Sequence, residues 1–392
     1  MIRPGLGAKI FRRNILKTEM FFESNIFEDL YTTYEYLKQC NYFYYVPKCY
    51  YSIYHDINSD SLSSNESAES FSKSLKIILM IYERTNRRSL RYSLELRIPK
   101  FERYMNYNSN LANVLEDKNL LYVFAQNAHV KMPKRFLACQ EGIFTDINNK
   151  TVSLADAILS VSNIGECFAK PSIGTDSGRG CEVYCFMDGK DRKTGKTCEE
   201  IIKELGKNFV MQERLICHES IKQLYDGSVN TFRIMTYRWH NEIIAAPVIM
   251  RIGKGGAYLD NAHAGGMFIA LSEDGSLHEK AFTELEDSYV EHPDSKIKFK
   301  NYKISLLPKV VETVKNMHYS LPTIGVINWD MTLDEEGNPV LIEANVNGGG
   351  IWLFQMAHGC GVFGDKTPEI LRWIGKMDKL NYEDRQMHHF GD

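Results

Sequence analysis

The chain has 392 residues, of which 44% are hydrophobic and 25% are charged, and its formal net charge is -3. This length allows two or three compact units, and the composition is typical of an ordinary globular protein. The small negative net charge argues against a nucleic-acid-binding protein of the basic-patch type, although it leaves room for a local basic site.

We also expect no transmembrane segment. The most apolar run, LKIILMIY at 75–82, is much shorter than the roughly 18–20 residues that span a bilayer. The first residues, MIRPGLGAKIFRRNILK, lack the apolar centre and cleavage site of a secretory signal. The nine cysteines include no CxxC pair, which argues against a zinc site and predicts reduced thiols in a cytoplasmic protein. The oligomeric state stays open.

The first 110 residues read as an irregular region with helical pieces. The Ser-rich segment at 58–74 has few apolar residues and predicts a surface loop. The segment at 83–103 is densely basic, and two interpretations remain: a solvated helix face, or a cradle for an anionic substrate.

From residue 111 the pattern becomes regular. A helix is expected over 111–130, an extended segment over 132–137, a helix over 153–161 and a strand over 165–172. A Gly/Ser loop at 171–180 then leads into another strand at 181–186. Rossmann and P-loop phosphate sites place a helix after their glycines. The order here instead predicts a hairpin flap.

The second half predicts mostly antiparallel strands. A helix over 199–209 and a strand over 210–217 precede two strands that turn at RWHNE, 238–242. Another hairpin turns at EDGS, 273–276, and a helix over 306–321 leads to a last hairpin over 324–347. The sequence therefore predicts an α+β fold.

The last hairpin brings polar side chains together. If its loop is DEEGNP, Leu333 lies opposite Val340 and Asp330 opposite Glu343. Glu343 and Asn345 then share a face with Asp330, because side chains alternate along a strand. Two carboxylates this close repel each other unless a cation lies between them, and oxygen ligands of this kind suit Mg²⁺. An exposed polar face with accidental pairing is the alternative.

Four segments in the same order resemble the ATP-grasp superfamily. They are the stretches at 116–137, CFAKPSIGTDSGRGCEVY at 167–184, VMQERLI at 210–216, and INWDMTLDEEGNPVLIEANVNGGG at 327–350. The resemblance covers about residues 111–365 and implies two α+β lobes with antiparallel sheets that enclose ATP. It divides the chain into an accessory N-terminal region at 1–110, a lobe with the Gly-rich flap at 111–215, and a lobe with the metal and acceptor sites at 216–392.

The resemblance also implies site residues. The residues implied for ATP are Lys118, Lys170, Ser177, Gly178, Arg179, Gly180, Gln212, Glu213, Leu215 and, for the ribose, Glu219. The implied ligands of two Mg²⁺ ions, which Mn²⁺ can replace, are Asp330, Glu343 and Asn345.

The segment at 226–277 is similar to the sugar-transfer-associated ATP-grasp proteins, which are linked with capsule, exopolysaccharide and O-antigen biosynthesis. The substrate residues that this similarity and the glycine turn imply are Asn230, Arg233, Arg251, Asn261, His263, Gly265, Gly266, Asn347 and Gly348. Without the resemblance, Arg233 and Arg251 would be partners of surface carboxylates.

The resemblance implies a ligase that activates a carboxylate as an acyl phosphate and passes it to an amine. Lys170, Arg233 and Arg251 would be its catalytic residues, and the acceptor an amine or a sugar that is free, nucleotide-linked or lipid-linked. Peptide-forming relatives often have Arg at the position of Asn328, which leaves another acceptor plausible. A sugar or polyol kinase and a non-catalytic nucleotide-binding assembly protein are the alternatives.

Overall fold

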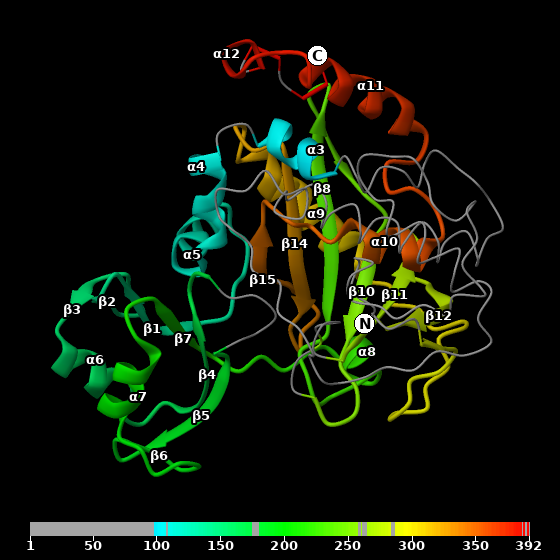
Figure 1. The fold of residues 1–392 in the computed structure, drawn as a ribbon. Helices are drawn as coiled ribbons and strands as arrows, with labels where there is room; N and C mark the ends of the chain where they lie inside the picture. The colour runs from blue at the N-terminus through cyan, green and yellow to red at the C-terminus, as the bar shows by residue number, and fades with distance from the viewer. Residues whose placement is uncertain are drawn as a thin grey trace, which may run out of the picture. The chain divides into compact units, whose positions relative to one another are not determined.

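The structure is a computed structural model, and it describes residues 98–106, 109–174, 180–257, 260, 265–283, 287–385, 387–388 and 390–391 (Figure 1). The chain divides into two units, residues 1–97 and 98–392. The predictions for the Ser-rich segment at 58–74 and for most of the basic segment at 83–103 lie outside the described residues. The predicted division into a region at 1–110 and two lobes at 111–215 and 216–392, with the role assigned to each, stays a prediction.

Twelve helical segments are described. They are α3 (Ile98–Met105), α4 (Ser109–Asn113), η5 (Val114–Glu116), α5 (Lys118–Asn127), α6 (Leu154–Val161), α7 (Cys198–Leu205), α8 (Glu219–Lys222), α9 (Leu307–Tyr319), α10 (Ile351–His358), η7 (Gly364–Lys366), α11 (Thr367–Met377) and α12 (Tyr382–Arg385). Among these helices, none has the length and apolar character needed to cross a bilayer.

The described strands form two separate sheets. The first sheet contains β1 (Arg135–Gln140), β2 (Ile143–Thr145), β3 (Thr151–Val152), β4 (Gly165–Pro171), β5 (Glu182–Met187), β6 (Lys190–Asp191) and β7 (Phe209–Gln212). The second contains β8 (Thr231–Trp239), β9 (Glu242–Ala245), β10 (Ile249–Ile252), β11 (Met267–Leu271), β12 (Leu277–Phe282), β13 (Ser288–Tyr289), β14 (Val326–Leu333) and β15 (Pro339–Asn345). Neighbouring strands are antiparallel, and the α+β prediction is confirmed.

The seven-stranded sheet has the order β3-β2-β1-β7-β4-β5-β6. Helices α6 and α7 bury Ala157, Val161 and Ile201 against it in one apolar cluster. Both helices begin at a side chain that caps the first turn, Ser153 for α6 and Thr197 for α7. Strands β4 and β5 pair directly across the Gly-rich segment, so the predicted order of strand, turn and strand is confirmed.

The eight-stranded sheet has the order β13-β12-β11-β10-β8-β14-β15, and β9 also pairs with β8. Side-chain alternation separates its two faces. Phe232 and Ile234 of β8 and Trp329 of β14 enter the apolar core that α9 covers. The residues that alternate with these along each strand project from the opposite face, and they include Arg233 and Asp330.

The register of the last hairpin is partly as predicted. Asp330 lies opposite Glu343, as expected, but Leu333 lies opposite Pro339 and not Val340. The register shifts by one residue between Asp330 and Met331, because a bulge inserts an extra residue into β15. A regular hairpin with the observed loop would have put Glu343 out of line with Asp330.

Three predicted elements differ from the structure. The segment after β8 holds two strands, β9 and β10, which pair with different parts of β8 on the same edge; Pro247 between them has no N–H to donate to a ladder. The predicted strand at 210–217 ends at Gln212. The predicted helix at 111–130 is interrupted at Asp117, whose side chain caps α5.

Candidate functional site

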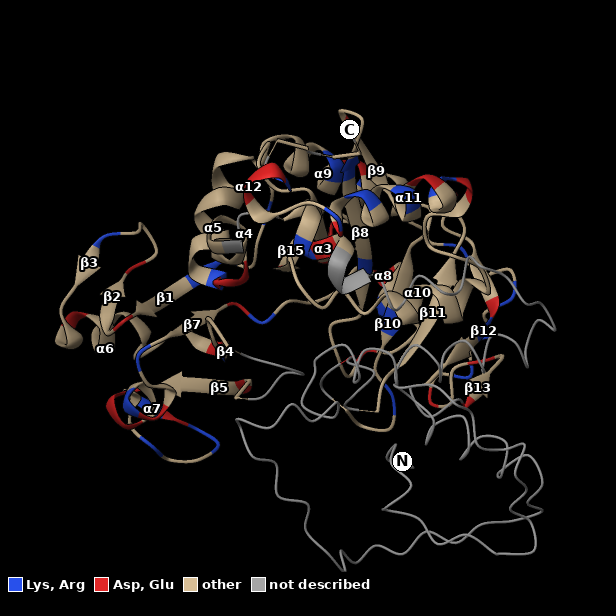
Figure 2. Cartoon of the chain, turned by 45° about the horizontal axis from the view of Figure 1, so that its top comes forward, with Lys and Arg blue, Asp and Glu red and all other residues tan. Residues whose placement is uncertain are grey.

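Neighbouring strands of the eight-stranded sheet bring the charged residues together. Arg233 on β8 lies opposite Asp330 on β14, and Asp330 lies opposite Glu343 on β15. On the other side of β8, Arg251 of β10 lies opposite Thr231. Figure 2 shows blue segments on the neighbouring strands β8 and β10. The face predicted from alternation therefore carries both arginines as well as the carboxylates.

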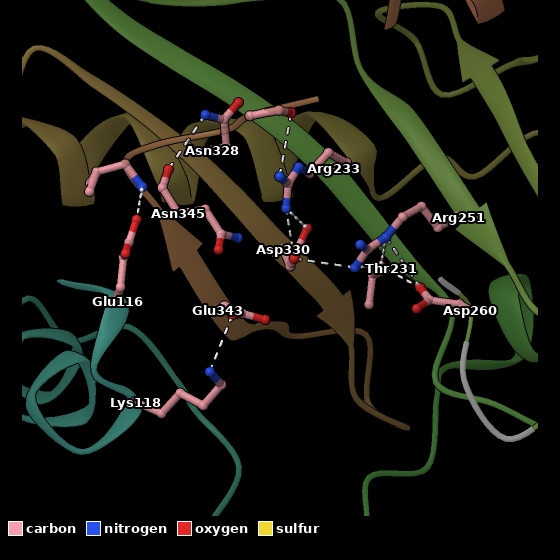
Figure 3. A network of polar contacts seen from close by, with 12 residues as sticks. Glu116, Lys118, Thr231, Arg233, Arg251, Asp260, Asn328, Asp330, Glu343 and Asn345 are labelled. Atoms are coloured by element: carbon pink, nitrogen blue, oxygen red, sulfur yellow. Dashed lines mark hydrogen bonds and ion pairs between the residues drawn. The ribbon is translucent and has the colours of Figure 1, made fainter. Parts of the chain in front are cut away.

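Asp330 is held between the two arginines (Figure 3). Arg233 Nη1 lies 2.9 Å from both carboxylate oxygens, and Arg251 Nη2 lies 3.2 Å from Oδ2. Burial favours the protonated acid, but the two guanidinium groups outweigh it and hold the pKa of Asp330 below its usual range. The carboxylate is thus ionised and 2% exposed.

A second buried carboxylate, Asp260, fixes the other side of Arg251. The hydroxyl of Thr231 accepts hydrogen bonds from Arg251 Nε and Nη2, at 3.0 and 2.9 Å, and donates one to Asp260. Burial works to lower the pKa of Arg251, but the charges of Asp260, Asp330 and Glu343 hold it above its usual value. Burial also raises the pKa of Asp260. The guanidinium is therefore permanently charged and fixed in orientation.

The other carboxylate of the hairpin is more open. Glu343 Oε1 lies 3.2 Å from Nζ of Lys118, and Glu343 keeps about a quarter of its side chain exposed (27%). A cavity of about 270 Å³ lies beside this pair, lined by Glu116, Lys118, Gly174, Glu343, Asn345, Asn347 and Gly348. Glu343 and Asn345 line it, whereas Asp330 does not.

Two lysines come together at this side of the site. The N–H of Lys118 donates to the carbonyl of Ser172, just after β4, at 3.0 Å, and this contact ties α5 to the strand that carries Lys170. Burial and the nearby ammonium of Lys118 lower the pKa of Lys170 to about 8. No described residue forms an ion pair with Lys170. A buried ammonium in this position favours an anionic ligand.

The metal prediction fits the residues only in part. Among the described residues, no three His, Cys, Asp or Glu side chains converge as metal ligands do. Glu343 and Asn345, whose side chains carry oxygen atoms, line the cavity, and such ligands suit Mg²⁺. Both oxygens of Asp330 already accept from arginines, although each carboxylate oxygen has a second lone pair. The cations beside the two carboxylates are thus protein side chains, which removes electrostatic repulsion as a reason for a metal.

The residues expected at the adenine and ribose lie at the end of β7 and on α8. Gln212 is buried at the end of β7, and the carboxylate of Glu213 accepts from the N–H of Lys134 at 2.7 Å. Leu215 is half-buried in the following segment. Glu219 is exposed and accepts from Gln223 at 3.0 Å. Their contact with a nucleotide stays a prediction.

Some predicted residues lie elsewhere or outside the description. Asn230 is fully buried, and its amide donates to the carbonyls of Ile221 and Tyr225. Its contact with a substrate stays a prediction. Gly265 and Gly266 lie just before β11, and Gly180 lies just before β5. The predicted residues outside the described part are Ser177, Gly178, Arg179, Asn261 and His263.

Four residues at the site were not predicted. Glu116 accepts from the N–H of Val346 at 3.2 Å and lines the cavity. Glu102 of α3 accepts from the N–H groups of Gly348 and Gly349. Thr231 and Asp260 are the other two. Only Thr231 had a sequence signal, because it alternates with Arg233 along one strand.

Comparison with known proteins identifies the family. The sequence profile of the family described as sugar-transfer associated ATP-grasp matches residues 97–369. No curated protein matches the sequence.

Similar solved structures include N5-carboxyaminoimidazole ribonucleotide synthetase in complex with ADP, with 12% identity over 61% of this chain and 46% of that chain and a TM-score of 0.37. D-alanyl-alanine synthetase A of Vibrio cholerae has 12% identity, coverages of 68% and 65%, and a TM-score of 0.39. The L-amino acid ligase of Bacillus licheniformis has 12% identity, coverages of 77% and 54%, and a TM-score of 0.37.

The match therefore spans about half the length of the first of these structures. Identities and TM-scores this low give no weight to these likenesses in assigning an activity. The family profile, by contrast, covers well over half of the 392 residues. The chain belongs to the sugar-transfer-associated ATP-grasp family.

Proposed function

We propose that the chain is an ATP- and Mg²⁺-dependent ligase that joins a carboxylate to an amine. The observation that carries this proposal is the convergence of Lys118, Arg233 and Arg251 on two ionisable carboxylates of one sheet face, beside a polar cavity. Lys170 adds a buried ammonium next to Lys118. Such an array suits the charge that moves during phosphoryl transfer.

The proposed reaction has two steps. An oxygen of the substrate carboxylate attacks the γ-phosphorus of ATP, the bond to the bridging oxygen breaks, and ADP leaves. The amine nitrogen then attacks the acyl carbon of the acyl phosphate and loses a proton, and inorganic phosphate leaves. An amide, ADP and phosphate are the products.

The position of each charged side chain determines its proposed role in the reaction. Lys118 and Lys170 bind the phosphates, since one lies at the cavity and the other is buried beside it. Arg251 orients the substrate carboxylate, because Thr231 and Asp260 hold its guanidinium in place. Arg233 neutralises Asp330 and supports the glycine turn through the carbonyl of Gly349, at 3.3 Å.

A bound Mg²⁺ would neutralise phosphate charge, and Glu343 with Asn345 would hold it, with the remaining lone pairs of Asp330 as a further donor. Gln212, Glu213 and Leu215 are proposed for the adenine, and Glu219 for the ribose. The nucleotide would lie in the cavity between Lys118 and Gly348.

The proposed substrates are small molecules: a carboxylic acid and an amine or amino sugar, free or linked to a nucleotide or lipid. The family description, sugar-transfer associated, supports a role in the synthesis of cell-surface polysaccharide. We place the reaction in the cytoplasm, where ATP is available.

Incubation of the full chain with ATP, Mg²⁺ and pairs of sugar acids, amino sugars and amino acids tests the proposal. The expected result is release of inorganic phosphate that requires both an acid and an amine, together with the mass of an amide. A phosphorylated product formed from a single acceptor would instead establish a kinase. Phosphate release independent of every acceptor would contradict both activities.

A further inference from the structure

Helix α3 lies before residue 111, where the motif resemblance begins, but inside the family match at 97–369, and it contributes two buried polar side chains. Glu102 and Asn106 are each 4% exposed. Burying a carboxylate costs free energy unless hydrogen bonds compensate for the lost water. The hydrogen-bond partners of Glu102 therefore show which part of the structure the helix stabilises.

Glu102 binds the backbone of the glycine turn that follows Asn345. Its Oε2 accepts from the N–H of Gly348 and its Oε1 from the N–H of Gly349, each at 3.0 Å. Gly348 has a φ of +63°, a conformation that glycine adopts without strain. One carboxylate thus satisfies two successive amides and fixes the turn.

The turn in turn contacts the charged site. The carbonyl of Gly349 accepts from Arg233 Nη2 at 3.3 Å, and Nη1 of the same guanidinium lies 2.9 Å from both oxygens of Asp330. A Cβ at Gly349 would lie 2.3 Å from the amide nitrogen of Asn328, so the side chain of Asn328 also packs closely against the turn. The contacts run from Glu102 through Gly349 and Arg233 to Asp330.

Helix α3 itself is firmly attached. The side chain of Asn106 donates to the carbonyls of Val326 and Val346, at 2.9 and 3.0 Å, and accepts from two N–H groups at the start of β14. Phe101 is fully buried, with its ring centroid 4.9 Å from that of Phe363. Glu102 is therefore held in place independently of the turn that it binds.

We propose that Glu102 is a positioning residue for the ATP-dependent reaction: its carboxylate sets the conformation of Gly348 and Gly349 and thereby places Arg233 against Asp330. Glu102 does not line the cavity, so it acts through the backbone. The inference rests on the proposed function, because Arg233 has a role in turnover only if the chain catalyses the proposed ATP-dependent reaction.

The test compares full-length wild type with Glu102→Gln. Glutamine has nearly the same shape but only one acceptor oxygen, so one of the two amides faces an NH₂ donor. We expect hydrogen exchange at Gly348 and Gly349 to become about tenfold faster, as for loss of one charge-assisted hydrogen bond. With substrates found as above, kcat should fall roughly tenfold or more while KM for ATP changes less than about threefold.

Two control variants separate positioning from general loss of stability. Ile370→Val removes one methylene from a fully buried side chain on α11, and it should lower the unfolding temperature without either effect. Glu199→Gln removes an exposed carboxylate and should leave all measurements unchanged.

Unchanged exchange at Gly348 and Gly349 in Glu102→Gln would overturn the inference whether or not the proposed function holds, because exchange needs no substrate. Faster exchange with a kcat equal to that of Ile370→Val would also overturn it. If wild type has no ATP turnover, the proposed function fails, and the link to Arg233 is judged by combining Glu102→Gln with Arg233→Met. Losses of urea midpoint that add fully would then exclude the link, and losses smaller than additive would support it.

Discussion

The two carboxylates of the last hairpin lie opposite each other but have different surroundings. Asp330 is 2% exposed and is enclosed by two arginines, whereas Glu343 faces a cavity and meets one lysine. In the first region the charges are matched within the protein, which favours a fixed geometry. In the second, the buried ammonium of Lys170 has no ion-pair partner among the described residues, which favours a ligand.

We therefore expect the two carboxylates to have different roles, Glu343 in ligand binding and Asp330 in positioning. A charged side chain at a ligand site binds its ligand more strongly when the protein provides no full ion-pair partner, since the ligand then supplies the opposite charge. A charged side chain that orients other groups is held in a fixed geometry when it is fully paired, and a preorganised site needs no rearrangement during the reaction. Each prediction below would weaken or strengthen this division.

The largest effect is expected for Glu343→Gln. If Glu343 binds the metal at the open region, its neutralisation should lower kcat by roughly a thousandfold or more, with little change in unfolding temperature because the side chain is partly exposed. Steady-state phosphate release measures the loss. Glu335→Gln, on the exposed hairpin loop, is the control, and turnover retained in Glu343→Gln would remove the metal assignment.

The enclosed region should respond mainly in stability. Arg233→Met leaves Asp330 buried with one of its two guanidinium partners, and loss of a partner from a buried pair costs about 3–5 kcal/mol. Urea unfolding followed by circular dichroism measures this cost. Adding Asp330→Leu should recover most of it, because no charge is then left uncompensated. A cost below about 1 kcal/mol would mean that the region is open to water.

The glycine turn links the two regions, and Gly349→Ala tests how closely it is confined. The added Cβ would lie 2.3–2.6 Å from side-chain atoms of Asn328. Either the turn or the Asn328 side chain must therefore move, at a cost of about 1–3 kcal/mol in folding stability. Thermal or urea unfolding should show this loss, and Asn328→Ala in the same chain should reduce it. Gly375→Ala, where no atom lies within 4 Å of the new Cβ, is the control.

Lys170, which has no ion-pair partner among the residues that the structure describes, predicts a pH dependence. Its pKa of about 8 lies below the unfolded value of about 10.4, so the unfolded state binds more protons between these values and stability should rise with pH across this window. Affinity for ATP should change in the opposite sense, weakening up to about tenfold per pH unit above pH 8 as the ammonium loses its proton. Calorimetric titration from pH 7 to 9.5 measures the affinity. Lys170→Met should be weaker throughout and should lose this dependence.

The smallest effect is expected at the edge of the proposed nucleotide site. Glu219 is exposed and contacts Gln223 of its own helix region, so Glu219→Ala should raise KM for ATP no more than about threefold even if it meets the ribose. Initial rates at varied ATP concentration measure this. A tenfold increase would show that the residue is closer to the nucleotide than its neighbours suggest.

Much of the hairpin site could be predicted from the sequence, because strand alternation is a local property. It placed Glu343 and Asn345 on one face, and the loop composition brought Asp330 opposite Glu343. The bulge in β15, between Leu341 and Glu343, could not be predicted, since no Gly or Pro lies there. The correct pairing of Asp330 was therefore reached with an incorrect register at Leu333.

By itself, the sequence determined the α+β class, the order of strand, glycine loop and strand at the flap, the family resemblance and the polar face of β15. These depend on periodicity and on motifs of a few adjacent residues. Only the tertiary structure decided which charges meet. Asp330 pairs with Arg233, which is 97 positions away, and Glu102 binds a turn 246 positions away. Such contacts arise from strand order and helix docking, which no local pattern specifies, so the separation into an open and an enclosed region could be seen only in the folded chain.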